Sequence, residues 1–321
     1  LKSGAVFSEI GEVTEGGNMK KTFIGRLMAA GIVSGLVLAG CAGRKEATVG
    51  TPGNPLVVAF SPEHVPSGTR EPLLFIKNYL SERTGMTVEV KTAVSALDLI
   101  DRLGSDKADV AFMTTEEYLV AREQYRVEAA LQVTRRAGET KYDAVILAKA
   151  AGGPKDAAGL AGRKFAFADP YSISGYFLPS AFLKNAKIKV QPVIAGSHKA
   201  ALAALLSANA DAAATYADAV KGHPELRVLA VTGTAPNEPV VVRRSLLLEK
   251  RQAVAAALVA LPGTPEGKKA LGAIADISGF APVSEAPYKA MHEKILAAGS
   301  SVYDLLPEGW QMRQLDQPYM P

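Results

Sequence analysis

The chain has 321 residues, of which 48% are hydrophobic and 21% charged, a composition typical of a globular protein long enough to form two lobes. Its 36 Lys and Arg residues against 32 Asp and Glu give a formal net charge of +4. This mild excess, without an arginine-rich run or basic residues interleaved with aromatic ones, argues against a nucleic-acid-binding protein.

Residues 19–41, MKKTFIGRLMAAGIVSGLVLAGC, have the pattern of a secretion signal. A short basic region precedes an apolar stretch that is shorter than a membrane-spanning helix requires, and small residues follow it. The last four residues, LAGC, resemble the bacterial lipoprotein box, in which the cysteine is lipidated. Cys41 is the only cysteine of the chain, so we expect it to be a lipid anchor. The protein would then be extracytoplasmic, on the periplasmic side in a Gram-negative cell.

The segments on either side of this apolar stretch carry two further expectations. Because a signal peptide begins with its basic end, residues 1–18 are interpreted as an upstream extension, with Met19 as the start of translation and 19–40 as the signal peptide. Residues 41–54 are small and polar and contain Gly and Pro, which predicts a flexible tether between the membrane and the folded part.

From residue 55 onward, apolar runs alternate with segments of helical periodicity. The first of these predict strands at 56–60, 86–94 and 108–113, and helices at 72–85, 96–104 and 116–125. This βαβαβα rhythm is typical of a mostly parallel sheet with helices on both faces.

A second unit of the same kind surrounds a Gly-rich break at 151–162. It has predicted strands at 142–149, 164–170, 189–196, 211–217 and 226–232, and predicted helices at 176–185 and 198–210. One more strand at 236–246 and three helical segments complete the chain.

This order predicts an α/β protein of two lobes, each a mostly parallel sheet flanked by helices. The first lobe would consist of 55–145 and 235–298, the second of 146–234, and 299–321 would be a C-terminal extension. Two chain crossings between the lobes form a hinge, and ligands bind where the strand ends of the two lobes face each other.

The segment DPYSISGYFLP, residues 169–179, joins a buried strand to a helix in the second lobe. Ser172 and Ser174 are good helix N-caps, and Gly175 allows the backbone to approach a ligand closely. Pro179 is tolerated in a first helical turn, so the helix is expected to begin near 174–176. Free N–H groups, two hydroxyls and the positive helix end would together bind an oxyanion. The alternative is that Ser174 caps its own helix and Ser172 only closes the turn.

A second turn, GSHKAALAAL, places His198 at the start of the next helix, again after a strand. With DPYSISGYFLP before it and ADAAATYAD after it, this pair of motifs resembles the phosphate/phosphite/phosphonate-binding proteins of bacterial ABC transporters. The resemblance covers roughly residues 55–295. It extends to PLVVAFSPEHVPSGTREPLLFIKNYLSERTGMTVEV, KADVAFM, RVLAVTGTAPNEPVVVRRSL and DISGFAPVSEAPYKAM.

The resemblance implies a two-lobed periplasmic-binding-protein type II fold that captures a phosphonate, phosphite or phosphate. Ser172 and Ser174 would donate to the oxyanion with the N–H groups of Ser174 and Gly175, and His198 would donate from the second helix. The expected partners are an ABC permease and its ATPase, with the binding protein itself a monomer. The same resemblance implies no cofactor and no enzymatic activity.

The chain departs from the family pattern at Ile173 and in the loop after the third strand, and it lacks the tyrosine that members can have around Ser95-Ala96. Ile173 stands where members often have a threonine, so one hydroxyl donor is missing. After the third strand, members often have an aromatic residue and a small Gly-containing loop, whereas this chain has Thr114 and Thr115, which could donate hydroxyls. Glu116 and Glu117 fit a helix first turn, and one of them turned inward would suit an amino group.

Enzymatic motifs are absent from the sequence. The four histidines are scattered, without H-E-x-x-H, and neither G-x-S-x-G, S-x-x-K nor a phosphate-binding G-x-x-x-x-G-K-[ST] loop occurs. Two rival functions remain open at this stage. One is a sensor lipoprotein of the same fold, and the other is an anchored hydrolase that uses His198 with Ser172 or Ser174.

Overall fold

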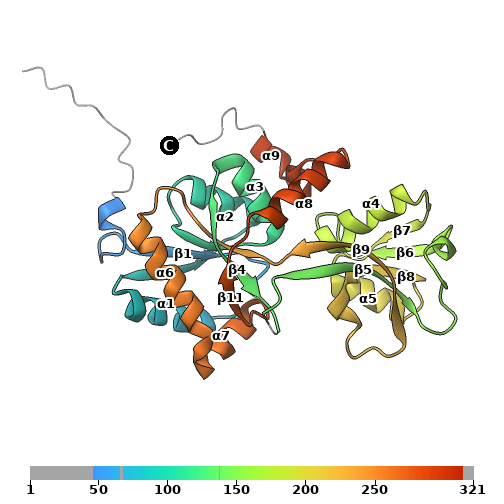
Figure 1. The fold of residues 1–321 in the computed structure, drawn as a ribbon, viewed down its shortest axis with the longest axis horizontal. Coiled ribbons are helices and arrows are strands. Elements are labelled where there is room, and N and C mark those ends of the chain that lie inside the picture. Colours follow the sequence, from blue (N-terminus) through green and yellow to red (C-terminus); the bar gives the residue numbers. More distant parts are fainter. Residues whose placement is uncertain (1–45, 66–67, 137, 314–321) are drawn as a thin grey trace, which may run out of the picture. The chain divides into compact units, whose positions relative to one another are not determined.

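The computed structural model describes residues 46–65, 68–136 and 138–313, all within the compact unit that spans 42–321 (Figure 1). The segments predicted as an upstream extension and a signal peptide, together with Cys41 and the residues from 314 onward, lie outside the described residues. The described part contains two β-sheets, each with helices on both faces, which confirms the predicted α/β fold class.

The first lobe is built on a sheet with the strand order β11-β4-β10-β3-β1-β2. Its strands are β1 (Leu56–Phe60), β2 (Val88–Thr92), β3 (Val110–Phe112), β4 (Glu128–Thr134), β10 (Pro239–Val242) and β11 (Gly279–Pro282). The apolar run of β1 is buried at every position because helices cover both faces of the sheet.

Two layers of helices enclose this sheet (Figure 1). On one face lie α1 (Glu71–Thr84), α6 (Leu248–Ala260) and α7 (Pro265–Ala275), with the short η5 (Leu261–Gly263); on the other lie α2 (Ala96–Gly104), α3 (Thr115–Tyr125) and α8 (Ala286–Ala297). Local signals fix several boundaries. Ser95 caps α2 by accepting a hydrogen bond from the Asp98 N–H, and α1 ends at Gly85 in the left-handed conformation.

The second lobe is built on a sheet with the order β7-β6-β8-β5-β9. Its elements are β5 (Lys141–Lys149), η2 (Ala158–Leu160), β6 (Lys164–Phe167), the π-helix η3 (Ile173–Phe177), α4 (Leu178–Asn185), β7 (Gln191–Ile194), α5 (His198–Leu206), β8 (Ala212–Tyr216), η4 (Ala217–Val220) and β9 (Leu226–Pro236). Separate core clusters against α5 and α4 show that these helices cover opposite faces.

The pairing within both sheets is mixed, which corrects the expectation of mostly parallel sheets. In the first sheet β1 pairs in parallel with β2 and β3, whereas β10 is antiparallel to β3 and β4, and β11 to β4. In the second sheet β6 pairs in parallel with β7 and β8, whereas β5 is antiparallel to β8 and β9. Four of the strands with antiparallel partners, β4, β5, β9 and β10, flank the two crossings between the lobes.

Two strand-like segments join the lobes, one between β4 and β5 and one between β9 and β10. Asn237 ties them together: its amide Nδ2 donates to the carbonyl oxygens of Val133 (3.1 Å) and Glu139 (2.8 Å). An ion pair between Arg135 and Glu238 adds a second link. All of β5 belongs to the second sheet, so the first crossing lies a few residues before the expected boundary at 145.

The N-terminal described segment is packed against the first lobe, in contrast to the expected tether at 41–54. It forms η1 (Glu46–Thr48), and Val49 is buried. Arg243, buried at the end of β10, pairs with both Glu46 and the fully buried Asp109. A buried guanidinium requires such partners, so this segment completes the charge balance of the lobe.

Most predicted elements are present with small shifts at their ends, and two strands were not predicted. These are β4 and β11, which lie side by side at one edge of the first sheet. The C-terminal residues up to 313 form η6 (Val302–Leu305) and α9 (Trp310–Arg313), which contribute Val302, Leu305 and Met312 to the core cluster around α3 and α8. Across the described ranges, the helices are all too short or too polar to cross a membrane.

Candidate functional site

The turn after β6 folds into a single wide helical turn. Asp169 Oδ1 accepts a hydrogen bond from the Tyr171 N–H, and Ser172, in an extended conformation, is the N-cap. The Phe177 N–H donates to the Ser172 carbonyl and the Leu178 N–H to the Ile173 carbonyl, both five residues apart, which is the π-helical spacing. π-turns of this kind occur frequently at functional sites.

The helix therefore begins at Ile173, slightly before the expected 174–176, and Ser172 rather than Ser174 is its cap. The Ser172 Oγ accepts from the Gly175 N–H at 2.9 Å, which leaves the Ser172 hydroxyl proton free to donate elsewhere. Ser174 is buried and bonds to Tyr142. Burial raises the pKa of the Tyr142 phenol, and the hydrogen bond to Ser174 opposes this effect.

Gly175 brings the backbone against two neighbouring residues. A Cβ atom at this position would lie 2.4 Å from the Ala168 Cβ and 3.0 Å from the His198 Cε1. The first distance is shorter than non-bonded carbon atoms tolerate, so the turn requires glycine for this close approach.

His198 enters the same place from the start of α5, where Ser197 is the N-cap and accepts from the Ala200 N–H. The His198 Nε2 lies 3.2 Å from the Ser172 Oγ, and its Nδ1 lies 3.0 Å from the Thr215 Oγ1. Burial lowers the pKa of His198, with a smaller opposing effect from Asp169, so the ring is neutral at pH 7. A neutral ring donates to one of these hydroxyls and accepts from the other.

The structure thus brings four of the predicted residues into one group. We call this group, together with Ile173, the cradle: Ser172, Ile173, Ser174, Gly175 and His198. Three further residues that had not been predicted support it, namely Tyr142, Thr215 and Tyr216, whose ring packs edge-on against His198 at 5.2 Å. Thr215 and Tyr216 lie at the end of β8, the strand that follows α5. Because the ends of parallel strands meet at one edge of a sheet, their position at a strand end was the sequence signal that could have identified them as site residues.

The residues predicted from the first lobe have different environments. Thr114 is the N-cap of α3, and its Oγ1 accepts from the Glu117 N–H in a capping box. Thr115 is buried, and its hydroxyl donates to the carbonyl of Pro236 in the second crossing. Neither threonine has a hydrogen bond to the cradle among the contacts of the described residues.

Glu116 is the residue of this turn that contacts the cradle. Its Oε1 accepts a hydrogen bond from the Ile173 N–H at 3.0 Å, across the two lobes. Burial raises the pKa of Glu116 to about 7, with the Ile173 N–H acting in the opposite direction. Ile173 itself is fully buried in the core cluster that also contains Tyr118 and Tyr288 of the first lobe.

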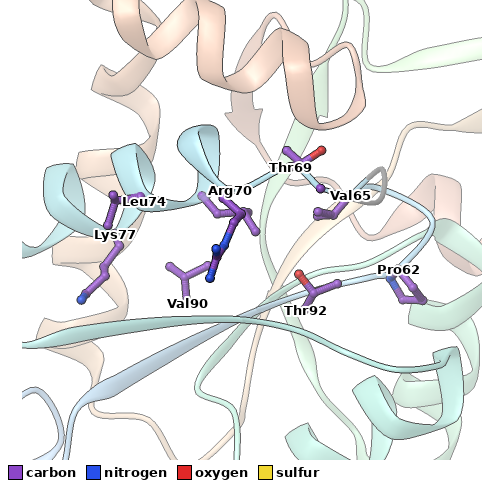
Figure 2. A pocket seen from close by; sticks show the side chains of 10 residues that line it. Pro62, Val65, Thr69, Arg70, Leu74, Lys77, Val90 and Thr92 are labelled. Atoms are coloured by element: carbon purple, nitrogen blue, oxygen red, sulfur yellow. The ribbon is translucent and has the colours of Figure 1, made fainter.

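A cavity of the first lobe lies away from the cradle. Figure 2 shows this space of about 560 Å³ between the N-terminal part of α1 and the edge strand β2, with Arg70 extended toward Val90. None of the predicted site residues lines it. Across the described ranges, no group of His, Cys, Asp or Glu side chains could hold a metal ion.

Comparison with known proteins places this arrangement in a known class. Residues 58–288 match the family described as ABC transporter, phosphonate, periplasmic substrate-binding protein. Three solved structures share the fold of this chain.

The first is a Xanthomonas citri protein bound to ATP, with 17% identity and a TM-score of 0.63, and the match covers 76% of this chain and 98% of that one. The second is the binding-protein component of a Pseudomonas aeruginosa ABC phosphonate transporter, with 17% identity, a TM-score of 0.59 and coverages of 81% and 94%. The third is PhnD1 from Prochlorococcus marinus in complex with methylphosphonate, with 16% identity, a TM-score of 0.58 and coverages of 76% and 98%.

The two mixed α/β lobes have the two-lobed fold of periplasmic binding proteins of type II. The chain belongs to the family of periplasmic substrate-binding proteins of phosphonate ABC transporters. Members of this family bind a substrate and are not enzymes, so the alternative of a hydrolase built on His198 with Ser172 or Ser174 is wrong.

Proposed function

We propose that this protein is a lipid-anchored receptor that captures a small phosphorus oxyanion in the cradle and delivers it to an ABC permease and ATPase. The ligand is a phosphonate, phosphite or phosphate, and the receptor acts as a monomer. The observation that carries the proposal is the convergence of two helix N-termini and their hydroxyls on one point, with Ser172 Oγ and His198 Nε2 3.2 Å apart.

Each cradle residue has a defined part in this proposal. The hydroxyls of Ser172 and Ser174, the N–H groups of Ser174 and Gly175, and one ring nitrogen of His198 donate to the anion. Gly175 and His198 would exchange their contacts with the Ser172 hydroxyl for contacts with the ligand. No lysine or arginine is needed, because the positive end of the helix and several neutral donors together stabilise an oxyanion. Thr114 and Thr115 would approach the ligand from the first lobe, with Thr114 the better placed because the Thr115 hydroxyl proton is engaged by Pro236.

Binding between lobes connects capture with delivery. The ligand would bridge the second lobe and the first, and the two crossings would act as the hinge. A closed, loaded form then presents a surface to the permease that the open form lacks, so that transport responds to loading.

The lipid anchor is the second part of the proposal. Its support is the LAGC sequence that ends in Cys41, the single cysteine of the chain. Replacing Cys41 with serine should release the protein from the membrane fraction into the soluble periplasmic fraction, as followed by fractionation and immunoblotting. Retention of Cys41→Ser in the membrane fraction would contradict anchoring through this residue.

The cradle is tested by a thermal-shift screen of the protein with phosphate, phosphite, methylphosphonate, 2-aminoethylphosphonate and sulfate. A ligand at 100-fold over its dissociation constant adds about 2.7 kcal/mol to the free energy of unfolding, so a binding anion should raise the unfolding midpoint. The double variant Ser172→Ala/Ser174→Ala should lose this increase. Its ligand-free midpoint should fall modestly, since loss of an N-cap costs about 0.5–2 kcal/mol.

A matched control is Ser105→Ala/Ser207→Ala, which removes two exposed hydroxyls at the C-terminal ends of α2 and α5. This control should keep the full ligand-induced shift. If the Ser172/Ser174 variant binds the anions as tightly as the parent does, the cradle is not the binding site.

A further inference from the structure

The first lobe places a carboxyl group directly at the anion-binding end of the cradle. The Glu116 Oε1 accepts from the Ile173 N–H at 3.0 Å, and this N–H is the first of the π-turn. A carboxylate oxygen therefore occupies one of the donors that an oxyanion would also use.

The neighbouring Glu117 cannot take this role. Its Oε2 accepts from the Thr114 N–H at 2.7 Å, its Oε1 accepts from the Ser61 hydroxyl at 2.8 Å, and its side chain is buried. Both oxygens are thus engaged within the first lobe, which leaves Glu116 as the carboxyl group of this turn that faces the second lobe.

The charges around Glu116 are predominantly negative. Asp169 after β6 and Glu238 at the second crossing both act to raise its pKa, and Glu117 lies beside it on α3. The phenol of Tyr142 on β5 also lies within range of its charge. Arg135, the guanidinium beside Glu238, is paired with that carboxylate, and no ion pair joins Glu116 to a Lys or Arg among the described residues.

An anion that enters the cradle must therefore lie next to a carboxyl group without a cation of its own. If that group were ionised, the two negative charges would repel each other in a partly desolvated place. A single proton between a carboxyl oxygen and a ligand oxygen removes the repulsion and replaces it with a short, strong hydrogen bond.

We propose that Glu116 is a specificity-determining residue and that the anion is bound with one proton shared between its carboxyl group and a ligand oxygen. This inference rests on the proposed function of the cradle. The favoured ligands are oxyanions that themselves carry a proton near neutral pH, namely phosphonates and phosphate. Sulfate brings no proton, so its binding depends on the protonated form of Glu116 alone.

The proposal fixes the direction of the pH dependence. Burial raises the pKa of Glu116 to about 7. Below pH 7 the carboxyl group therefore already holds the proton, and the affinity for sulfate should not change with pH. Above pH 7 the free protein has lost this proton and must take one up from water when the anion binds. Sulfate affinity should then fall by about tenfold for each pH unit. Burial lowers the pKa of His198, so His198 stays neutral throughout this window and does not contribute to the slope.

The experiment is isothermal titration calorimetry of the full chain with sulfate, inorganic phosphate and methylphosphonate between pH 6.5 and 8.5. Buffers of different ionisation enthalpy give the number of protons taken up with each anion. The parent is compared with Glu116→Gln, which keeps the size of the side chain and an acceptor for the Ile173 N–H but cannot titrate. Glu116→Ala serves as a second variant, and Glu123→Gln, an exposed residue of the same helix, is the control.

For the parent and Glu123→Gln, sulfate should bind with uptake of close to one proton at pH 8.5. In Glu116→Gln this uptake should vanish, sulfate affinity should no longer depend on pH, and the preference for methylphosphonate over sulfate at pH 8.5 should shrink by about tenfold. Sulfate binding that appears only in the two Glu116 variants would support the proposal equally.

Other results would overturn it. If Glu116→Gln and Glu116→Ala bind the anions with the parent's pH slope and proton count, Glu116 carries no shared proton although the cradle binds anions. If the parent binds none of the three anions at any pH, the proposed function itself fails, and this inference fails with it.

Discussion

Gly175 brings the backbone of the cradle against Ala168 and His198, and this contact can be tested with a single methyl group. In Gly175→Ala the new Cβ would lie 2.4 Å from the Ala168 Cβ and 3.0 Å from the His198 Cε1, so the π-turn must shift away from both residues. Overpacking of this kind costs about 1–3 kcal/mol of unfolding free energy, and displacement of the donors should weaken anion binding by about tenfold or more.

Urea unfolding and calorimetric titration with phosphate would measure both effects. The control is Gly272→Ala on α7, where a Cβ meets nothing within 4 Å. In a helix interior this change should stabilise the protein by about 0.5–1 kcal/mol and leave anion binding unchanged. Parent-like affinity in Gly175→Ala would show that the cradle does not need its close backbone approach.

Ile173 connects the cradle to the first lobe. Its side chain is fully buried in the core cluster shared with the first lobe, and its N–H donates to Glu116. Where the related proteins often have a threonine hydroxyl, this chain has an apolar contact. The position therefore contributes to the contact between the lobes, and under the proposed function the remaining donors of the cradle would hold the ligand.

At the level of elements, Asp109 joins three strands and the N-terminal segment of the first lobe. Its Oδ2 accepts from the Val57 N–H at 2.7 Å and its Oδ1 from the Arg243 Nε at 2.7 Å, and Arg243 in turn reaches Glu46. Asp109→Asn removes the one fully buried carboxylate that pairs with the buried guanidinium, so we expect a loss of about 3–5 kcal/mol in unfolding free energy.

Chemical denaturation measures the free energy of unfolding of Asp109→Asn and of a control variant, Asp101→Asn. Asp101 forms an exposed pair with Lys107 at 3.8 Å, and breaking such a pair should cost at most about 1 kcal/mol. A loss below about 1 kcal/mol in Asp109→Asn would mean that the structure relaxes around Arg243 or that water reaches it.

The elements that sequence patterns predicted well are those with local signals. The helix at 96–104 has a Ser cap and a sharp apolar stripe, and its predicted ends match α2. The strands β4 and β11 were missed because they depend on partners far along the chain. β4 begins with exposed and half-buried residues, and β11 is four residues long and contains Pro, so neither has a strong pattern of its own.

The same distinction applies to the candidate site. The two turns of the cradle could be predicted because each follows a strand and carries cap residues. The orientation of Glu117 was also readable, since Thr114-x-x-Glu117 is the signature of a capping box. The contact between Glu116 and Ile173 was not, because it joins residues 57 positions apart from different lobes.

At the level of the whole molecule, Asn237 holds the two crossings at a fixed distance. It links Val133, Glu139 and Thr140 of the first crossing, and its carbonyl accepts from the Tyr288 hydroxyl at 2.7 Å. Asn237→Ala leaves the buried carbonyl of Val133 without this donor and removes the part-buried bond to the Glu139 carbonyl, which should cost about 1–3 kcal/mol of unfolding free energy.

Because a ligand between the lobes depends on their orientation, Asn237→Ala should also weaken anion binding, although it removes no atom of the cradle. Titration calorimetry with methylphosphonate measures this effect, with the exposed Asn209→Ala as the control. If Asn237→Ala loses stability but binds methylphosphonate as the parent does, the crossings do not set the ligand geometry.

The packed N-terminal segment has a consequence for how such a receptor would work at a membrane. Only five residue steps separate Cys41 from Glu46, which is fixed to the first lobe through Arg243. A fully extended chain of that length spans at most about 17 Å. With the lipid at Cys41 as proposed, a short tether would hold the first lobe close to the bilayer. Such a receptor would search for a permease by diffusing in two dimensions, with the second lobe as the part that moves.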